Sequence, residues 1–169
     1  ATYSPNPAVF QNTAPGVDGK LIFSWATTCD HIKEQPYQVV FKISDKPANG
    51  PSLVQFKTWN IRVVGPAPKW EPPVVNLGTR SVNLEWEDYA CKSNAVTMQV
   101  WRRVDEFSYT PPECVTGMPD FLGYTKIADV PMTNTTYNDT NKGKGLDVGA
   151  QYCYRLVAVF PLPGGGESY

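Results

Sequence analysis

Residues 146–158 constrain the fold more than any other part of the chain. Gly149 follows Leu146 by three positions, and Tyr152 follows Gly149 by three more. From Tyr152 onward every second side chain is aromatic or aliphatic, which is the alternation of a half-buried β-strand. In β-sandwiches a tyrosine near the start of such a strand folds back to hydrogen-bond the preceding corner, a feature called the tyrosine corner. The stretch therefore predicts a β-sandwich.

The rest of the composition extends this β prediction to the whole chain. With 169 residues there is room for one large domain or two small ones. No long stretch carries apolar residues at helical spacing, whereas alternating runs of Val, Ile, Thr and Tyr recur between segments rich in Pro and Gly. We therefore expect an all-β fold.

Charge and hydropathy exclude two kinds of partner. The formal net charge is −1 and no basic stripe is present, so we expect no nucleic acid partner. No apolar run approaches the roughly 18 residues of a transmembrane helix, so we expect no direct membrane insertion.

A proline-rich connector divides the chain into two units. Proline fixes φ and lacks a backbone donor, so Gly65-Pro66-Ala67-Pro68 and the prolines after it cannot lie inside a sheet. We expect a small β-sandwich at residues 1–65, a stiff linker at residues 66–71, and a second sandwich at residues 72–169. The second unit carries an insertion at residues 104–122, longer than the roughly two to five residues of ordinary hairpin loops.

Alternating apolar residues locate the expected strands within each unit. In the first unit they lie at residues 21–25, 37–43 and 54–64, with Ile43 facing inward. In the second unit they lie at residues 82–86, 96–100, 124–130, 136–137 and 152–158, with Val96 facing inward.

Residues 72–169 resemble a fibronectin type III domain. The resemblance rests on Leu84-Glu85-Trp86, on Tyr137-Asn138-Asp139, and on the spacing of Leu146, Gly149 and Tyr152. Residues 1–65 resemble the C-terminal part of an immunoglobulin-like or cadherin-like repeat, through Phe23-Ser24-Trp25, Tyr37-Gln38-Val39-Val40-Phe41 and Thr58-Trp59-Asn60-Ile61-Arg62-Val63. The first strands of that unit are expected to be short or missing.

The pairing of the two units resembles segments of very large surface proteins of Bacteroidetes bacteria, described as gliding-motility-associated and exported by type IX secretion. The resemblance implies a non-catalytic structural or adhesive segment at the outer cell surface, and we expect the chain to be an internal piece of a longer polypeptide. The expected partners are neighbouring domains of the same polypeptide and either a surface glycan or another surface protein. An alternative is a carbohydrate-binding or spacer module of an exported polysaccharide-degrading enzyme.

The four cysteines fit an oxidising compartment, because an even number in a β-rich chain favours disulfides. No Cys-x-x-Cys pair occurs, so we expect no zinc site. The preferred disulfide joins Cys114 in the insertion to Cys153, since antiparallel pairing of residues 96–100 with residues 152–158 brings the two close. An alternative joins Cys91 to Cys114, and Cys29 is either free or bonded to Cys91 or to sequence beyond this segment.

No catalytic constellation or cofactor site is expected. His31 is the only histidine, and although Cys29 is two residues away, that adjacency alone does not make a dyad. Asp30 and Asp45 are weak calcium candidates, but no Asp-x-Asp-x-Asp-Gly loop is present, so we expect these side chains to cap turns. We therefore predict that the chain is not an enzyme.

One surface is a candidate for binding. Trp101 is out of phase with the inward residues of its strand and is expected to face outward. Phe107 and Tyr109 of the insertion could join it in a platform for sugar rings, with Arg102, Arg103 and Arg155 stacked against these aromatic rings. Alternatively, the insertion simply covers Trp101.

Overall fold

A computed structural model describes residues 9–12, 21–45, 47–110, 112 and 115–168, with no side-chain description for residues 10–12 and 21. In these ranges the regular structure is β, apart from two short 3-10 helices, η1 (Cys29–His31) and η2 (Asp120–Leu122). The strands form four antiparallel sheets, which confirms the expected all-β fold. No helix within the described ranges is long and apolar enough to cross a membrane.

The N-terminal sheets are two hairpins that meet through aromatic rings. Strand β1 (Val9–Asn12) pairs with β2 (Leu21–Ser24), and β3 (Tyr37–Ser44) pairs with β4 (Val54–Ile61). The ring of Phe23 on β2 lies 6.4 Å from the rings of Phe41 on β3 and Trp59 on β4. The three predicted strands are therefore present, although Ile43 is 55% exposed and not inward. This residue pairs with Gln55 next to the turn that connects β3 and β4.

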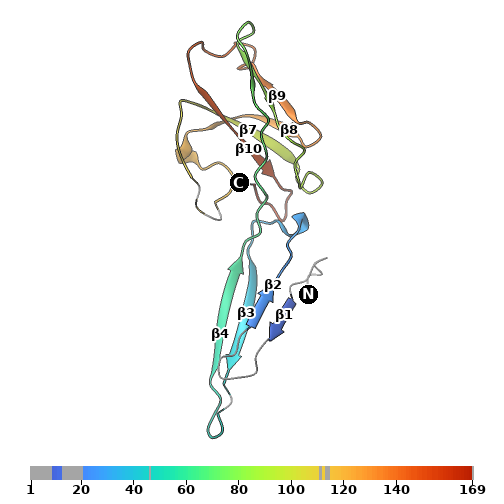
Figure 1. Ribbon diagram of the computed structural model, residues 1–169, viewed down its shortest axis with the longest axis vertical. Coiled ribbons are helices and arrows are strands. Elements are labelled where there is room, and N and C mark those ends of the chain that lie inside the picture. The colour runs from blue at the N-terminus through green and yellow to red at the C-terminus, as the bar shows by residue number, and fades with distance from the viewer. Residues whose placement is uncertain (1–8, 13–20, 46, 111, 113–114, 169) are drawn as a thin grey trace.

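The C-terminal sheets contain three strands each. One has the order β5 (Val74–Asn76), β6 (Ser81–Glu85) and β9 (Thr136–Asp139), and the other has the order β10 (Tyr152–Val159), β7 (Thr97–Val104) and β8 (Thr125–Pro131). Both lie above the N-terminal sheets along the long axis of the molecule (Figure 1). The prediction that Val96 faces inward is wrong, since it precedes the first paired residue of β7 and is 56% exposed.

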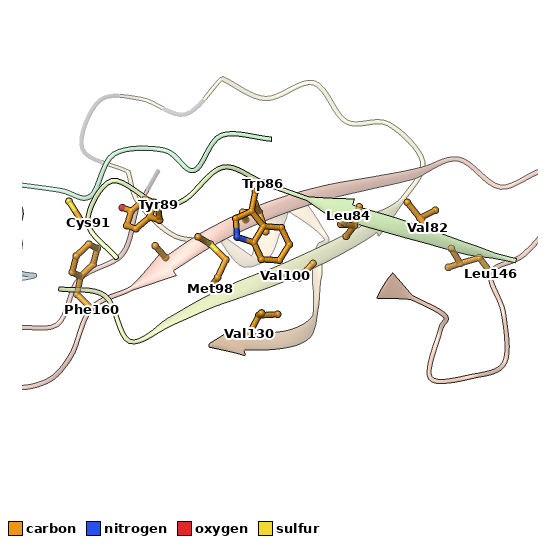
Figure 2. Close-up of a cluster of buried hydrophobic side chains, with 12 residues drawn as sticks. Val82, Leu84, Trp86, Tyr89, Cys91, Met98, Val100, Val130, Leu146 and Phe160 are labelled. Carbon is orange, nitrogen blue, oxygen red and sulfur yellow. The ribbon is translucent and has the colours of Figure 1, made fainter. Parts of the chain in front are cut away.

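The main hydrophobic core lies between the two C-terminal sheets. Figure 2 shows its side chains, which come from strands of both sheets and from the segments next to them. Leu84 of β6 faces Met98 and Val100 of β7, and all three are fully buried. Leu156 and Ala158 of β10 belong to the same cluster. Because both sheets contribute apolar side chains to one core, the arrangement is consistent with a β-sandwich.

The predicted tyrosine corner is present. The backbone N–H of Asp147 donates a 2.9 Å hydrogen bond to the hydroxyl oxygen of Tyr152. Leu146 is buried in the core, and Gly149 has φ of 85°, a left-handed conformation that favours glycine. The corner therefore positions the start of β10.

The proline-rich connector lies at a sheet edge. Gly65 forms an isolated bridge with Ser168, and Trp70 forms one with Trp86 at the end of β6. The hydroxyl of Tyr89 donates a 2.9 Å hydrogen bond to the carbonyl of Pro66. Proline is tolerated at such an edge because no ladder hydrogen bond is required from its nitrogen. The connector is therefore held against the C-terminal sheets.

Candidate functional site

A covalent bond joins the N-terminal and C-terminal sheets. Cys29, the first residue of η1, is disulfide-bonded to Cys91 in the segment between β6 and β7, and the Cα atoms are 5.5 Å apart. Beside this bond, the amide Nδ2 of Asn94 donates a hydrogen bond to Oδ1 of Asp30. Figure 1 shows η1 where the lower sheets approach the upper ones. We call these contacts, together with the connector at residues 65–68, the joint.

His31 lies at the joint and is 2% exposed. Its Nδ1 atom accepts a 2.8 Å hydrogen bond from the backbone N–H of Thr28, the residue that caps η1. The ring of Trp25 packs edge-on at 5.0 Å, and the hydroxyl of Tyr37 donates a 2.9 Å hydrogen bond to the His31 carbonyl. Burial raises the pKa of Tyr37. Because the neighbouring Cys29 is in a disulfide, it does not present a thiolate to the imidazole.

The cysteine pairing differs from the preferred expectation. The bond between Cys29 and Cys91 was one of the open alternatives for Cys29, and it excludes the alternative pairing of Cys91 with Cys114. Cys153 is half-buried and has no disulfide partner among the described residues, and Cys114 lies outside them. The bond between Cys114 and Cys153 therefore stays a prediction. Sequence spacing did not favour Cys29–Cys91, because this bond depends on how the two sets of sheets meet.

The expected binding residues gather on the outer face of the β7–β10 sheet. Trp101 on β7 is half-buried and lies opposite Arg155 on β10, so the two share a face. The Arg103 guanidinium stacks over the Phe107 ring at 4.6 Å from its centroid. Arg155 donates a long hydrogen bond of 3.5 Å to the carbonyl of Tyr109.

These contacts fasten the insertion after β7 onto the sheet. Arg103 also donates a 2.9 Å hydrogen bond to the carbonyl of Leu122, whose side chain is 1% exposed. Arg155 lies over the ring of Tyr124, and Tyr109 contacts Phe121 edge-on at 5.3 Å. The predicted stacking is thus present for Arg103, which lies over Phe107, whereas Arg155 lies over Tyr124 and contacts Tyr109 through its carbonyl.

The expectation is wrong for Arg102, which points to the opposite face of β7. Its Nη1 atom donates hydrogen bonds of 3.1 and 3.0 Å to the two carboxylate oxygens of Asp139, which is 2% exposed. Tyr154 donates a 2.9 Å hydrogen bond from its hydroxyl to the same carboxylate, and the backbone N–H of Asn141 donates another at 3.0 Å. We call these four residues the Asp139 network. The alternation of β7 indicates this orientation, since Arg102 is in phase with the inward residues Met98 and Val100.

The environment of the Asp139 network is that of a structural ion pair. Burial, followed by the hydrogen bond and negative charge of Asp139, raises the pKa of the Tyr154 hydroxyl. The phenol therefore stays protonated and acts only as a donor. The buried carboxylate accepts hydrogen bonds from Arg102, Tyr154 and the backbone of Asn141, so this site holds β7, β9 and β10 together.

The calcium candidates act as hydrogen-bond acceptors in the fold. Asp30 binds Asn94 as described above, and Asp45 Oδ1 accepts a 2.6 Å hydrogen bond from the backbone N–H of Leu53. Over the described ranges no group of three or more His, Cys, Asp or Glu side chains is placed to hold a metal ion.

One cavity beside β10 was not predicted from the sequence. It has a volume of about 440 Å³ and lies between β5, the start of β6 and the start of β10. Its lining is mainly apolar, including Val75, Val82, Val148 and Tyr152. Asp147 is the one acidic side chain among its described lining residues, so no carboxylate pair for acid–base chemistry forms there.

Comparison of the chain with models of known protein families finds no match. No curated protein matches the chain either.

Proposed function

We propose that this chain is a stiff, non-catalytic segment of a large exported cell-surface protein. In this proposal the N-terminal sheets belong to an immunoglobulin-like domain and the C-terminal sheets to a fibronectin type III-like domain. The segment holds other parts of the same polypeptide at a fixed distance and orientation. The observation that carries the proposal is the covalent joint, in which Cys29 and Cys91 bridge a sequence separation of 62 residues.

Stiffness follows from having several attachments at the joint. A single flexible linker leaves neighbouring domains free to move, because interfaces between domains are usually small and polar. Here the disulfide lies on one side of the joint and the connector bridge between Gly65 and Ser168 supplies another attachment. The backbone N–H of Glu34 also donates a 3.0 Å hydrogen bond to the carbonyl of Gly164. Rotation about the connector would break these contacts together.

Export is supported by the disulfide, since such bonds persist in oxidising compartments and are rare in the cytosol. The sequence resemblance to gliding-motility-associated surface proteins of Bacteroidetes supports the same location. The partners in this proposal are the neighbouring domains and either a surface glycan or another surface protein.

Residual dipolar couplings at neutral pH test the proposed stiffness. If the joint is stiff, couplings from the N-terminal and C-terminal sheets will fit one alignment tensor with the same magnitude and orientation. If the two parts need tensors of clearly different magnitude, they move independently and the proposal is wrong. Backbone assignments of β3, β4, β7 and β10 supply vectors on both sides of the joint.

The outer face of the β7–β10 sheet favours a second candidate function, binding of carbohydrate. The supporting observation is that Trp101, Arg103, Arg155, Phe107 and Tyr109 gather there. Aromatic rings and exposed apolar surface are common features of binding sites. In this reading the chain is an accessory module of an exported polysaccharide-degrading enzyme.

Titration with soluble polysaccharides tests this second candidate. Trp101→Ala should abolish the binding heat, because the indole would supply the stacking surface. Trp59→Ala is the matched control, since Trp59 is 54% exposed but lies on the N-terminal sheets. Equal binding by both variants would contradict a role for the outer face.

A further inference from the structure

We propose that the outer face of the β7–β10 sheet binds acidic polysaccharide, whose sugar units carry a carboxylate, in preference to neutral polysaccharide. Arg103 and Arg155 are the side chains that would bind the carboxylate. The inference rests on the second candidate function, binding of carbohydrate on this face, and it names the class of ligand. It does not depend on the stiffness of the joint.

The two arginines are neighbours on one face of the sheet. Arg155 on β10 pairs with Trp101 on β7, and Arg103 lies two positions further along β7. Side chains two positions apart on a strand share a face, so Arg103 and Arg155 are diagonal neighbours across the strand pair. Diagonal positions are roughly 7–8 Å apart, a separation that long side chains span. A single carboxylate between them is therefore within reach of both guanidinium groups.

No carboxylate among the described residues compensates these two charges. The ion pairs in that part of the chain involve other side chains. The acceptors for Arg103 and Arg155 are neutral carbonyl oxygens, those of Leu122 at 2.9 Å and Tyr109 at 3.5 Å. Because a guanidinium has five N–H donors, both groups keep donors for a ligand.

The charge on this face is complementary to that of a carboxylate. Two like charges at such a spacing repel each other, and an anion between them offsets the repulsion. The planar fork of a guanidinium also matches the two oxygens of a carboxylate. The chain as a whole has a net charge of −1, so attraction of an acidic polymer depends on this local pair and not on the total charge.

Aromatic rings beside the arginines favour a sugar as the carrier of the carboxylate. Arg103 lies over the ring of Phe107, which is 41% exposed. Phe121 is 66% exposed and contacts the ring of Tyr109, whose carbonyl accepts the hydrogen bond from Arg155. Binding sites for small molecules combine such apolar rings with a few polar groups that fix orientation. An acidic sugar presents both a ring face and a carboxylate in one unit.

Isothermal titration of the whole chain with polygalacturonate and with its carboxyl-reduced form, at physiological salt, tests the inference. The two polymers share ring and linkage and differ in the carboxylate. We expect the reduced polymer to bind about tenfold more weakly, as loss of a charge-assisted hydrogen bond predicts. Equal affinity for the two polymers would overturn the inference.

The failure of the inference is distinguishable from failure of the candidate function. If neutral polysaccharides bind and polygalacturonate does not, the preference for acidic sugars is wrong and carbohydrate binding stands. If neither kind of polymer binds, the second candidate function is wrong and the inference falls with it.

Arg155→Gln tests the residue, and Arg80→Gln is the matched control. Arg155→Gln removes the charge but keeps a side-chain donor, so binding of polygalacturonate should fall about tenfold and binding of the reduced polymer should not change. Arg80 is exposed in the turn between β5 and β6, where it donates to the carbonyl of Lys144, and its replacement should leave both affinities unchanged. Equal losses in the two variants would indicate non-specific charge attraction and overturn the inference.

Discussion

At the scale of single residues, Asp139 shows how a buried charge is accommodated between the C-terminal sheets. Its carboxylate accepts hydrogen bonds from Arg102, Tyr154 and the backbone of Asn141, which come from different elements. A buried ion pair of this kind contributes little net stability over apolar residues, but removing one partner leaves the other charge uncompensated. The Asp139 network therefore specifies how β7, β9 and β10 come together.

Asp139→Asn should lower the free energy of unfolding by about 3 kcal/mol, because the half-buried Arg102 guanidinium would lose its counter-charge. Urea unfolding at pH 7 measures the loss. Asp129→Asn is the control, since the ion pair of Asp129 with Lys126 is exposed and should be worth less than about 1 kcal/mol. Similar losses in the two variants would contradict the proposed importance of burial.

Buried tyrosines predict a stability limit at alkaline pH. Burial raises the pKa of the Tyr89 hydroxyl to about 12, from 10.0 for a free tyrosine, with a smaller opposing effect from Ser168. Because the folded-state pKa is the higher one, the stabilisation is complete below pH 10 and is lost as the pH rises toward 12. Urea unfolding at increasing pH should show this decline, and Tyr89→Phe should make it shallower. A stability that is constant from pH 9 to pH 12 would contradict the prediction.

At the scale of elements, the tyrosine corner sets where β10 begins. The Tyr152 hydroxyl reaches back to Asp147, and Leu146 anchors the corner in the core. The sequence spacing from Leu146 to Tyr152 predicts this contact, because the residues that form it lie in one turn and at the start of the strand that follows.

Tyr152→Phe should cost about 1 kcal/mol, the usual net value of one hydrogen bond, because the ring is kept and only the hydroxyl is lost. Chemical unfolding gives the value. Tyr124→Phe is the control, since Tyr124 contacts Arg155 through its ring face. The outcome that contradicts the prediction is an unchanged stability for Tyr152→Phe.

At the scale of the whole molecule, the joint decides whether the N-terminal and C-terminal sheets act as one body. The N-terminal sheets have little core of their own. Most side chains of β4 are exposed, and among the described residues of these sheets Phe41 is the only buried hydrophobic one. A small core gives limited independent stability, so attachment to the C-terminal sheets should matter for folding as well as for stiffness.

Replacing both Cys29 and Cys91 by Ser should lower the unfolding free energy by about 4 kcal/mol, the loop-entropy value for a closed segment of this size. It should also give the two parts separate alignment tensors at pH 7.5. Thermal unfolding and residual dipolar couplings measure the two effects. Cys153→Ser is the control for alignment, since it leaves the bond between Cys29 and Cys91 intact and should keep one shared tensor. A double variant that keeps one shared tensor would show that the connector alone is sufficient.

Local pattern determined the all-β fold, most strand positions and the tyrosine corner, because alternation and short spacings are properties of neighbouring residues. The same alternation indicated which side of β7 holds Trp101 and which holds Arg102, although the stacking expectation for Arg102 overlooked it. Tertiary structure alone decided that Cys29 bonds Cys91, that His31 is buried beside that bond, and that a cavity opens beside β10. Each of these joins residues far apart in the chain, and their meeting depends on how complete sheets pack, which no local spacing encodes.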